Sequence, residues 1–296
     1  MKRMLLMLIA AGMILPAAVK ATEDTAAGWL AVDVQKKEYF VMQPPHRSRT
    51  YTGIAWLPGQ SAQYVRTEQS VLLLSRNGDG SRIMRYPLNG AAPDPALELS
   101  DAINAFSYAG GVYYYGVGKN IYRSSDVTGL FYASQGDIVS LGAFPAEGVV
   151  AVAERHPVKR VKNKLVDTTE SVRLYLVEMA TGNAILVDEF VGGVVYSPEQ
   201  GMIVYEKRFD LSLNRRSILK IHDVRAQRTM VTPHAFQSLA RGNFFISRTM
   251  MILGTERSSI WNDERKMKTT YWYYDTEQGK LSKLLNTNTE ETLILE

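Results

Sequence analysis

A turn-and-strand pattern that recurs at a spacing of roughly 40 to 53 residues constrains this chain more than any other feature. In the second half, three hydrophobic runs end in similar triplets, Ala153-Glu154-Arg155, Tyr205-Glu206-Lys207 and Thr255-Glu256-Arg257. A repeat of this length is one supersecondary unit that has to pack against neighbouring copies to bury its hydrophobic face. The sequence therefore predicts several similar units that follow one another along the chain.

The hydrophobic runs have the composition of short β-strands. They are rich in β-branched and aromatic residues and are bounded by turn residues, as at 29–32, 71–74, 112–115, 149–152, 202–205 and 271–274. One segment, 100–109, begins like a helical turn, but its Tyr and Gly residues favour a strand. The repeat period matches one blade of a β-propeller. We therefore expect an all-β chain that forms a single β-propeller over residues 22–296, built from four-stranded antiparallel sheets. We expect six blades, with five and seven left open.

Two kinds of turn recur between these strands. The first joins an aromatic residue, a proline and a glycine and is predicted to form tight hairpins, at 56–59, 144–148 and 196–201. The second places an acidic residue four positions before a Gly or Gln, in the segments 175–183, 221–227 and 273–280, and 32–37 fits the same template. We expect this acidic side chain to accept hydrogen bonds from backbone N–H groups of its own turn.

The segment Tyr196-Ser197-Pro198-Glu199-Gln200-Gly201-Met202-Ile203-Val204-Tyr205 resembles the repeat motif of TolB-type and WD-like β-propellers, with Glu in place of the usual Asp. Degenerate copies surround Pro58 and Pro145, and the segments near 108–111 and 241–243 lack the proline. The resemblance implies a propeller fold. For function it implies a binding platform, an assembly factor or a non-catalytic domain of a peptidase.

The pattern divides most of the chain into units near 54–99, 104–134, 141–190, 193–232 and 238–285. A two-strand piece at 29–42 and a C-terminal strand at 292–295 are left over. A blade completed by strands from both ends of the chain would use both pieces and remove the open sheet edge.

The first 21 residues have the pattern of a cleaved secretory signal peptide. Lys2 and Arg3 precede an apolar stretch from Met4 to Leu15, and Pro16 and Val19-Lys20-Ala21 follow it. The stretch is shorter than the roughly 20 residues that span a bilayer. An uncleaved anchor stays open as an alternative. We therefore expect a periplasmic or secreted protein that is not inserted in a membrane after cleavage. The chain has no cysteine, so it has neither a lipobox nor a disulfide framework.

The charge balance gives no reason to expect a nucleic acid as partner. Without Lys2, Arg3 and Lys20, 31 of the 34 basic residues remain against 30 acidic ones. The mature chain is then nearly neutral, and signatures of DNA- or RNA-binding modules are absent.

Three long connections, at 155–169, 207–216 and 257–269, concentrate basic residues. In a propeller the connection between the second and third strands lies on the same face in every blade, and we assign these segments to that position. The residues predicted to contact a partner are Arg160, Lys162, Arg208, Phe209, Arg215, Trp261, Arg265 and Lys266. Such a rim would steer an acidic protein of the envelope or the extracellular space. Two alternatives stay open. Nearby acidic residues could cancel the charge, and the aromatic residues could fold back onto the sheets.

Motifs of catalysis and of cofactor binding are missing. No Gly-x-Ser-x-Gly elbow is present, the four histidines do not have metal-ligand spacing, and the segment 77–81 is typical of a hairpin turn rather than a calcium loop. We expect His222 to be structural. We predict no catalytic residue, no metal and no cofactor. The predicted function is that of an exported, non-catalytic interaction or assembly platform in the cell envelope.

A second function remains open. Some propellers are glycan-active enzymes that place paired carboxylates in a central funnel, and others bind small ligands or glycans there. No motif selects a pair of carboxylates in this sequence. The acidic residues kept as candidates are Asp101, Asp126, Asp137, Asp188 and Glu189.

Overall fold

The computed structural model describes residues 28–294, except for 44–47, 59, 79, 125–128, 158–169, 209–216, 237–243, 246–249, 262–263, 276–279 and 289–291. Within this part the chain forms strands and two single 3-10 turns, and no α-helix. In these residues no helix is long and apolar enough to cross a membrane. The expected signal peptide at 1–21 lies outside the described residues and stays a prediction.

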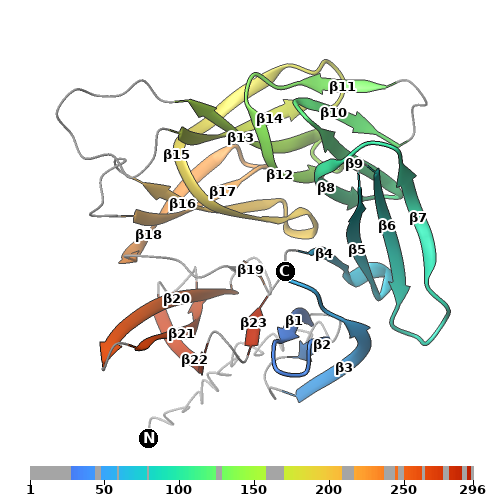
Figure 1. Ribbon diagram of the computed structural model, residues 1–296. Helices are drawn as coiled ribbons and strands as arrows, with labels where there is room; N and C mark the ends of the chain where they lie inside the picture. The colour runs from blue at the N-terminus through green and yellow to red at the C-terminus, as the bar shows by residue number, and fades with distance from the viewer. Residues whose placement is uncertain are drawn as a thin grey trace, which may run out of the picture.

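The strands pair into antiparallel sheets that lie in a ring (Figure 1). Three four-stranded sheets follow the chain in order. The first contains β1 (Trp29–Asp33), β2 (Glu38–Gln43) and β3 (Ser48–Ala55), together with β23 (Thr292–Ile294). The second contains β4 (Ser61–Val65), β5 (Ser70–Asn77), β6 (Gly80–Pro87) and β7 (Asp94–Leu99). The third contains β8 (Ile103–Ala109), β9 (Val112–Val117), β10 (Asn120–Arg123) and β11 (Leu130–Ala133).

A seven-stranded sheet follows. Its strands are β12 (Asp137–Phe144), β13 (Val149–Pro157), β14 (Glu170–Glu178), β15 (Ala184–Ser197), β16 (Met202–Arg208), β17 (Ser217–Asp223) and β18 (Arg228–Phe236). The last sheet contains β19 (Phe244–Phe245), β20 (Met250–Trp261), β21 (Glu264–Asp275) and β22 (Lys280–Asn288). The two 3-10 turns are η1 (Arg66–Glu68) and η2 (Pro198–Gln200).

The strand β15 belongs to two four-stranded units. Its first half pairs with β14 and its second half with β16, and the register shifts between Val191 and Val194. The units β12–β15 and β15–β18 therefore share one long strand, and with them the described strands form six four-stranded units. The expectation of four-stranded antiparallel sheets is confirmed, and the number of blades stays a prediction.

The two ends of the chain meet in one sheet, as the leftover segments predicted. β1 pairs with β23 through Ala31 with Ile294, Val32 with Leu293 and Asp33 with Thr292. This pairing gives the innermost strand of the first sheet a C-terminal origin and covers the edge of β1.

The predicted turns are mostly present. Asp33 accepts a hydrogen bond from the Lys36 N–H at 3.1 Å, and Asp223 accepts one from the Ala226 N–H at 2.9 Å. Glu178 instead accepts the Thr181 hydroxyl at 2.7 Å. The turns at 144–148 and 196–201 connect paired strands, and Asn77 pairs with Gly80 across the β5–β6 hairpin. The expected hairpin at 56–59 is wrong. This segment runs between two sheets, from β3 to β4, because a Pro-Gly pair also suits a change of direction without strand pairing.

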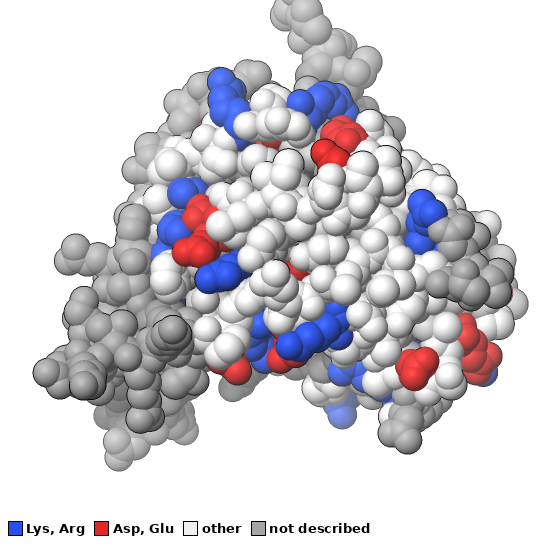
Figure 2. Space-filling model, turned by 90° about the horizontal axis from the view of Figure 1, so that it is seen from above, with Lys and Arg blue, Asp and Glu red and all other residues white. Residues whose placement is uncertain are grey.

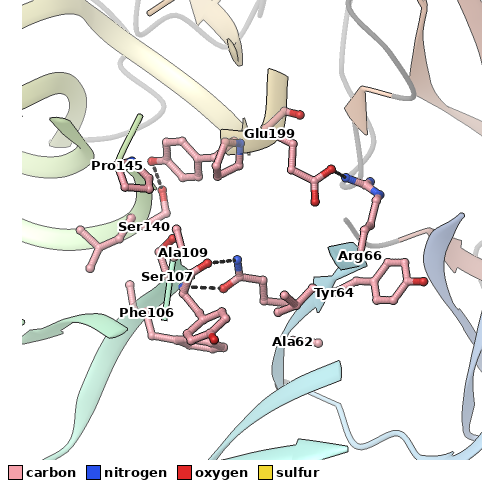
Figure 3. A pocket seen from close by; sticks show the side chains of 18 of the residues that line it. Ala62, Tyr64, Arg66, Phe106, Ser107, Ala109, Ser140, Pro145 and Glu199 are labelled. Atoms are coloured by element: carbon pink, nitrogen blue, oxygen red, sulfur yellow. Dashed lines mark hydrogen bonds and ion pairs between the residues drawn. The ribbon is translucent and has the colours of Figure 1, made fainter. Parts of the chain in front are cut away.

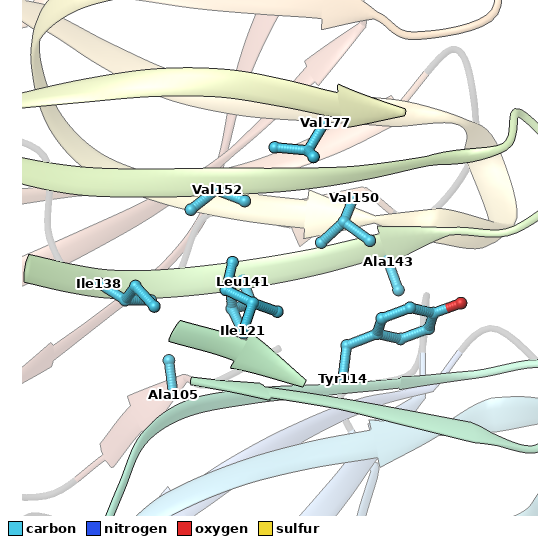
Figure 4. Close-up of a cluster of buried hydrophobic side chains, with 9 residues drawn as sticks. All are labelled: Ala105, Tyr114, Ile121, Ile138, Leu141, Ala143, Val150, Val152 and Val177. Atoms are coloured by element: carbon cyan, nitrogen blue, oxygen red, sulfur yellow. The ribbon is translucent and has the colours of Figure 1, made fainter. Parts of the chain in front are cut away.

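The hydrophobic core consists of clusters between neighbouring sheets. In the cluster of Figure 4, side chains of the third sheet pack against those of β12, β13 and β14. Its members include Ile121, Ala143, Val150, Val152 and Val177, each fully buried. A fully buried aliphatic side chain contributes about 1.5–3 kcal/mol. This packing fixes the angle between sheets, and so the shape of the space that their inner strands enclose.

The acidic residue of the repeated triplets is buried in the two units where its side chain is described. Glu154 is 1% exposed and Glu206 is 6% exposed. The Oε2 atom of Glu154 lies 3.0 Å from the Nε2 atom of His156, and the Oε1 atom of Glu206 lies 3.6 Å from the Nε atom of Arg208. The triplet thus marks a polar position inside the sheets rather than a solvated strand end.

An ion-pair cluster joins β15 to the next two strands. Asp188 accepts hydrogen bonds from the Nζ atoms of Lys207 at 2.6 Å and Lys220 at 2.7 Å, and from the Tyr205 hydroxyl at 2.9 Å. Burial of this carboxyl opposes its ionisation. The hydrogen bonds from the two lysines outweigh burial and lower the pKa of Asp188 to about 2.

We expect Gly142→Ala to destabilise the fold by about 1–3 kcal/mol through overpacking. A Cβ atom at residue 142 would lie 2.2 Å from the Cγ atom of Tyr196, whose ring packs over β12 from β15. Gly193→Ala is the matched control, since nothing lies within 4 Å of its added Cβ atom. Chemical denaturation of both variants measures the difference. Equal stability of the two variants would contradict the close approach.

We expect Asp188→Asn to lower the free energy of unfolding at neutral pH by about 2–3 kcal/mol, because two half-buried lysines lose their counter-charge. The folded-state pKa lies below the ordinary value of 3.8. The ionised carboxylate therefore stabilises the fold above that value, and its contribution is lost as the pH falls toward the folded pKa. The stability gap between the wild type and the variant should narrow over this acidic range in denaturation measured at several pH values.

The control Glu189→Gln removes a more exposed pair with Arg173 and should cost less than about 1 kcal/mol. A cost as small for Asp188→Asn would sink the prediction.

Candidate functional site

A cavity of about 630 Å³ lies where the inner strands of four units approach one another (Figure 3). Its walls come from β4, β8, β12 and the second half of β15, with the turns that follow these strands. Each of these is the first strand of its unit, and the cavity therefore lies at the centre of the ring; we call it the axial cavity. Its volume falls in the range typical of sites for small ligands.

Three of the turns at the rim of the axial cavity share one backbone geometry. The N–H groups of Gln69, Gly148 and Gly201 donate to the carbonyl oxygens of Arg66, Pro145 and Pro198 at 3.1–3.2 Å. All three donor residues have positive φ. The Pro-Glu-Gln-Gly turn that resembles the propeller motif is one of them. Sequence reasoning missed the turn at Arg66–Gln69, because it has no proline and Gln69 stands where the other two have glycine.

An ion pair crosses the axial cavity. The Nη1 atom of Arg66, on η1, lies 3.5 Å from the Oε2 atom of Glu199, on η2 (Figure 3). The two residues belong to the second and fifth units along the chain. The Nε atom of Arg66 also donates to the carbonyl oxygen of Gly28 at 3.0 Å. The pair thus connects units that are not neighbours in the chain.

A second polar group ties β4 to β8 on the cavity wall. The side-chain amide of Gln63 donates to the Tyr108 carbonyl oxygen at 3.0 Å and accepts from the Tyr108 N–H at 2.8 Å (Figure 3). The Tyr108 hydroxyl donates to Glu68, and Arg85 lies 3.3 Å from the other oxygen of Glu68. Burial, followed by the bond to Glu68, raises the pKa of Tyr108. Both oxygens of Glu68 are therefore engaged.

The wall formed by β12 and β15 carries hydroxyl groups. The Ser140 and Tyr196 hydroxyls lie 2.8 Å apart. Ser197 is only 5% exposed, and within the described part of the chain its Oγ atom has no hydrogen-bond partner. Buried hydroxyls without a partner are uncommon in folded proteins. Ser197 is thus a polar group on the cavity wall that can still form a hydrogen bond.

The predicted partner-contact residues lie away from the axial cavity or outside the described residues. Arg208 ends β16, is partly buried and lies beside Glu206. Trp261, Arg265 and Lys266 belong to the β20–β21 hairpin, in which Trp261 pairs with Glu264. The remaining four, Arg160, Lys162, Phe209 and Arg215, are outside the described residues. The expectation that 257–269 forms a loop is wrong. Apart from 262–263, which lie outside the described residues, this segment continues β20 and β21, which pair as far as Trp261 with Glu264. Antiparallel strands can stay paired up to a two-residue connection, so the length of the segment did not require a loop.

The two candidate regions lie at opposite ends of the sheets. The rim of the axial cavity is made by connections between the first and second strands of units. The predicted contact residues lie in the connections between second and third strands or at the strand ends beside them. Successive antiparallel strands reverse direction, so these two kinds of connection leave the sheet at opposite ends. Sequence reasoning predicted the residues of the second region and named a central funnel as an alternative site, but it named none of the residues that line the axial cavity.

None of the acidic residues kept for an enzymatic role lines the axial cavity, as far as the structure describes them. Asp101 and Asp137 are exposed at strand starts, and Asp188 and Glu189 lie on the outer half of β15. Asp126 is outside the described residues. The carboxylates that do line the cavity are Glu68 and Glu199.

His222, which we expected to be structural, is buried, and its Nδ1 atom lies 2.9 Å from the Thr229 hydroxyl.

Charges of both signs are present on one face of the molecule (Figure 2). On the face shown in Figure 2, groups of Lys and Arg lie next to groups of Asp and Glu. Among the described residues, no group of three or more His, Cys, Asp and Glu side chains could hold a metal ion.

The comparisons with known proteins rest on structure. No protein-family model and no curated protein matches the sequence. TolB from Acinetobacter baumannii matches with a TM-score of 0.61 and 10% identity over 90% of this chain, which spans 64% of the TolB chain. A chain of a nidogen/laminin complex matches with a TM-score of 0.53 and 8% identity, covering 90% of this chain and 96% of that one. A DUF4784 family protein from Bacteroides caccae matches with a TM-score of 0.51 and 10% identity, covering 91% and 73%. At such identities the likeness concerns the fold, and the chain is a β-propeller that resembles TolB in fold.

Proposed function

We propose that this chain is an exported β-propeller that binds an acidic protein of the cell envelope or the extracellular space and catalyses no reaction itself. The fold it shares with TolB, and with a chain solved in a nidogen/laminin complex, supports this proposal. Propellers present rigid loops at the ends of their sheets, and such loops commonly carry binding residues.

The observation that supports the proposal best is the strand order of three consecutive units. The connections β13–β14, β16–β17 and β20–β21 each join the second strand of a unit to the third, and they leave the sheets at the same end. The basic and aromatic residues that the sequence predicts as contacts lie in these connections or at the strand ends beside them. Aromatic and arginine side chains are enriched among the residues that dominate protein interfaces.

The axial cavity gives less support to glycan hydrolysis. Glycosidases need two carboxyl groups that flank a sugar bond and act separately as acid and as base or nucleophile. Here Glu68 is held by Tyr108 and Arg85, and Glu199 is paired with Arg66. Because both oxygens of Glu68 are engaged, Glu199 lacks a second available carboxylate among the residues that line the cavity.

We expect the double reversal Arg265→Glu/Lys266→Glu to reduce capture of the partner about tenfold or more, because like charges would face an acidic surface. Crosslinking in the native cell envelope, followed by mass spectrometry, measures the capture. Arg208→Glu is a poorer test, since it would also leave the buried Glu206 without its neighbouring cation.

The matched control reverses two exposed basic residues at the opposite end, Arg228→Glu/Lys280→Glu, at the starts of β18 and β22. The control should keep the captured partner. Equal capture by both double variants would count against the basic end as the binding surface. Glycan hydrolysis that one carboxylate substitution abolishes would favour the enzymatic alternative.

We also expect the exported protein to begin at Thr22, because the small residues before that position suit a signal peptidase. N-terminal sequencing of the protein recovered from the periplasm or the medium measures this. A mature protein that still begins at Met1 and fractionates with membranes would support the uncleaved anchor instead.

A further inference from the structure

We propose that the axial cavity binds a small zwitterion, namely a short peptide with both termini free. This site lies at the opposite end of the sheets from the proposed protein-binding surface and does not depend on it.

The ion pair across the cavity provides both charges that such a ligand needs. Arg66 and Glu199 make one contact of 3.5 Å, and their side chains are 19% and 40% exposed. A pair of this length and exposure contributes only about 0–1 kcal/mol. Each side chain is positioned by its own turn, and Arg66 is also anchored to the Gly28 carbonyl oxygen. The pair can therefore separate and take new partners without a change of fold.

The balance of charge selects a ligand with both signs. The two carboxylates that line the cavity, Glu68 and Glu199, are each matched by an arginine. A ligand with one net charge would leave an unmatched charge in a partly buried site, which is costly. A zwitterion exchanges one weak ion pair for two, with its carboxylate on Arg66 and its ammonium group on Glu199.

Ser197 adds a third polar contact. Its Oγ atom is buried on the cavity wall without a hydrogen-bond partner among the described residues, two positions before Glu199 in the chain. Among the other polar groups of the wall, Gln63 bonds to the Tyr108 backbone, Ser140 bonds to Tyr196, and Ser107 accepts a hydrogen bond from the Ala143 N–H. The Ser197 hydroxyl thus has hydrogen-bonding capacity that a ligand would reach after rotation of this side chain, because its Oγ atom is buried.

The remaining walls suit the body of a short peptide. Aromatic and aliphatic side chains line the cavity, among them Tyr64, Phe106, Leu141 and Val194. The cavity, at about 630 Å³, is larger than a single amino acid needs and has room for a dipeptide or tripeptide. Charged termini at the rim and apolar side chains against the walls would fix one orientation.

The test is a thermal-shift screen of the purified protein against dipeptides with free termini, followed by titration calorimetry of those that raise Tm. Each active dipeptide is then measured as its N-acetyl and C-amide forms. We expect either cap to weaken binding about tenfold or more, because a charge-assisted hydrogen bond is lost. Failure of every free dipeptide to bind, or equal binding of the capped forms, would overturn the proposal.

Variants locate the site. Glu199→Gln and Arg66→Gln should each weaken binding about tenfold or more, and Ser197→Ala less. The matched control is Arg82→Gln/Glu98→Gln, an exposed pair at 2.6 Å between β6 and β7. The control should bind like the wild type. Glu199→Gln leaves the anchor to Gly28 intact, so it remains informative if Arg66→Gln lowers Tm. Unchanged binding in a folded Glu199→Gln variant would overturn the assignment.

Discussion

The pairing of β23 with β1 is the constraint on which the rest of the structure depends. Three backbone pairs bring residues 292–294 into the sheet formed by residues 29–55. Loops closed over almost the whole chain cost conformational entropy, which only the summed packing between sheets can offset. Once the ring closes, the first strands of the units face one another. The walls of the axial cavity come from four consecutive units, so its shape depends on how their sheets pack against one another.

Local turn chemistry could be predicted from the sequence, because the residues that determine it are adjacent in the chain. Asp33 and Asp223 accept the backbone hydrogen bonds of their own turns, and the turns at Pro145 and Pro198 join paired strands. The same reasoning failed at Trp56–Pro58, where the turn leads to another sheet. A local signal predicts a change of direction, whereas strand pairing is decided by the partner strand.

The residues that line the axial cavity could not be predicted, because contacts between segments distant in sequence bring them together. Arg66 and Glu199 come together only after four units have packed. No sequence motif indicates that these two residues form an ion pair. Gln69 adopts positive φ, which is usually a glycine conformation. The turn at Arg66–Gln69 was therefore not recognised from the sequence. Likewise, the burial of Glu154 and Glu206 depends on neighbours that the repeat alone does not reveal. The repeat shows that an acidic residue recurs at this position, and the structure shows that the residue is buried there.

The two ends of the sheets are so far apart that the charges at one end have little effect on those at the other. A strand of nine residues such as β13 spans about 30 Å at about 3.3 Å per residue. The Debye length at physiological ionic strength is about 8 Å, so charges at one end are largely screened from solvent-exposed charges at the other. A near-neutral chain can therefore present a basic surface at one end and a charge-balanced cavity at the other. An acidic protein bound at the β20–β21 hairpin would therefore contact different charged residues from a zwitterion bound between Arg66 and Glu199.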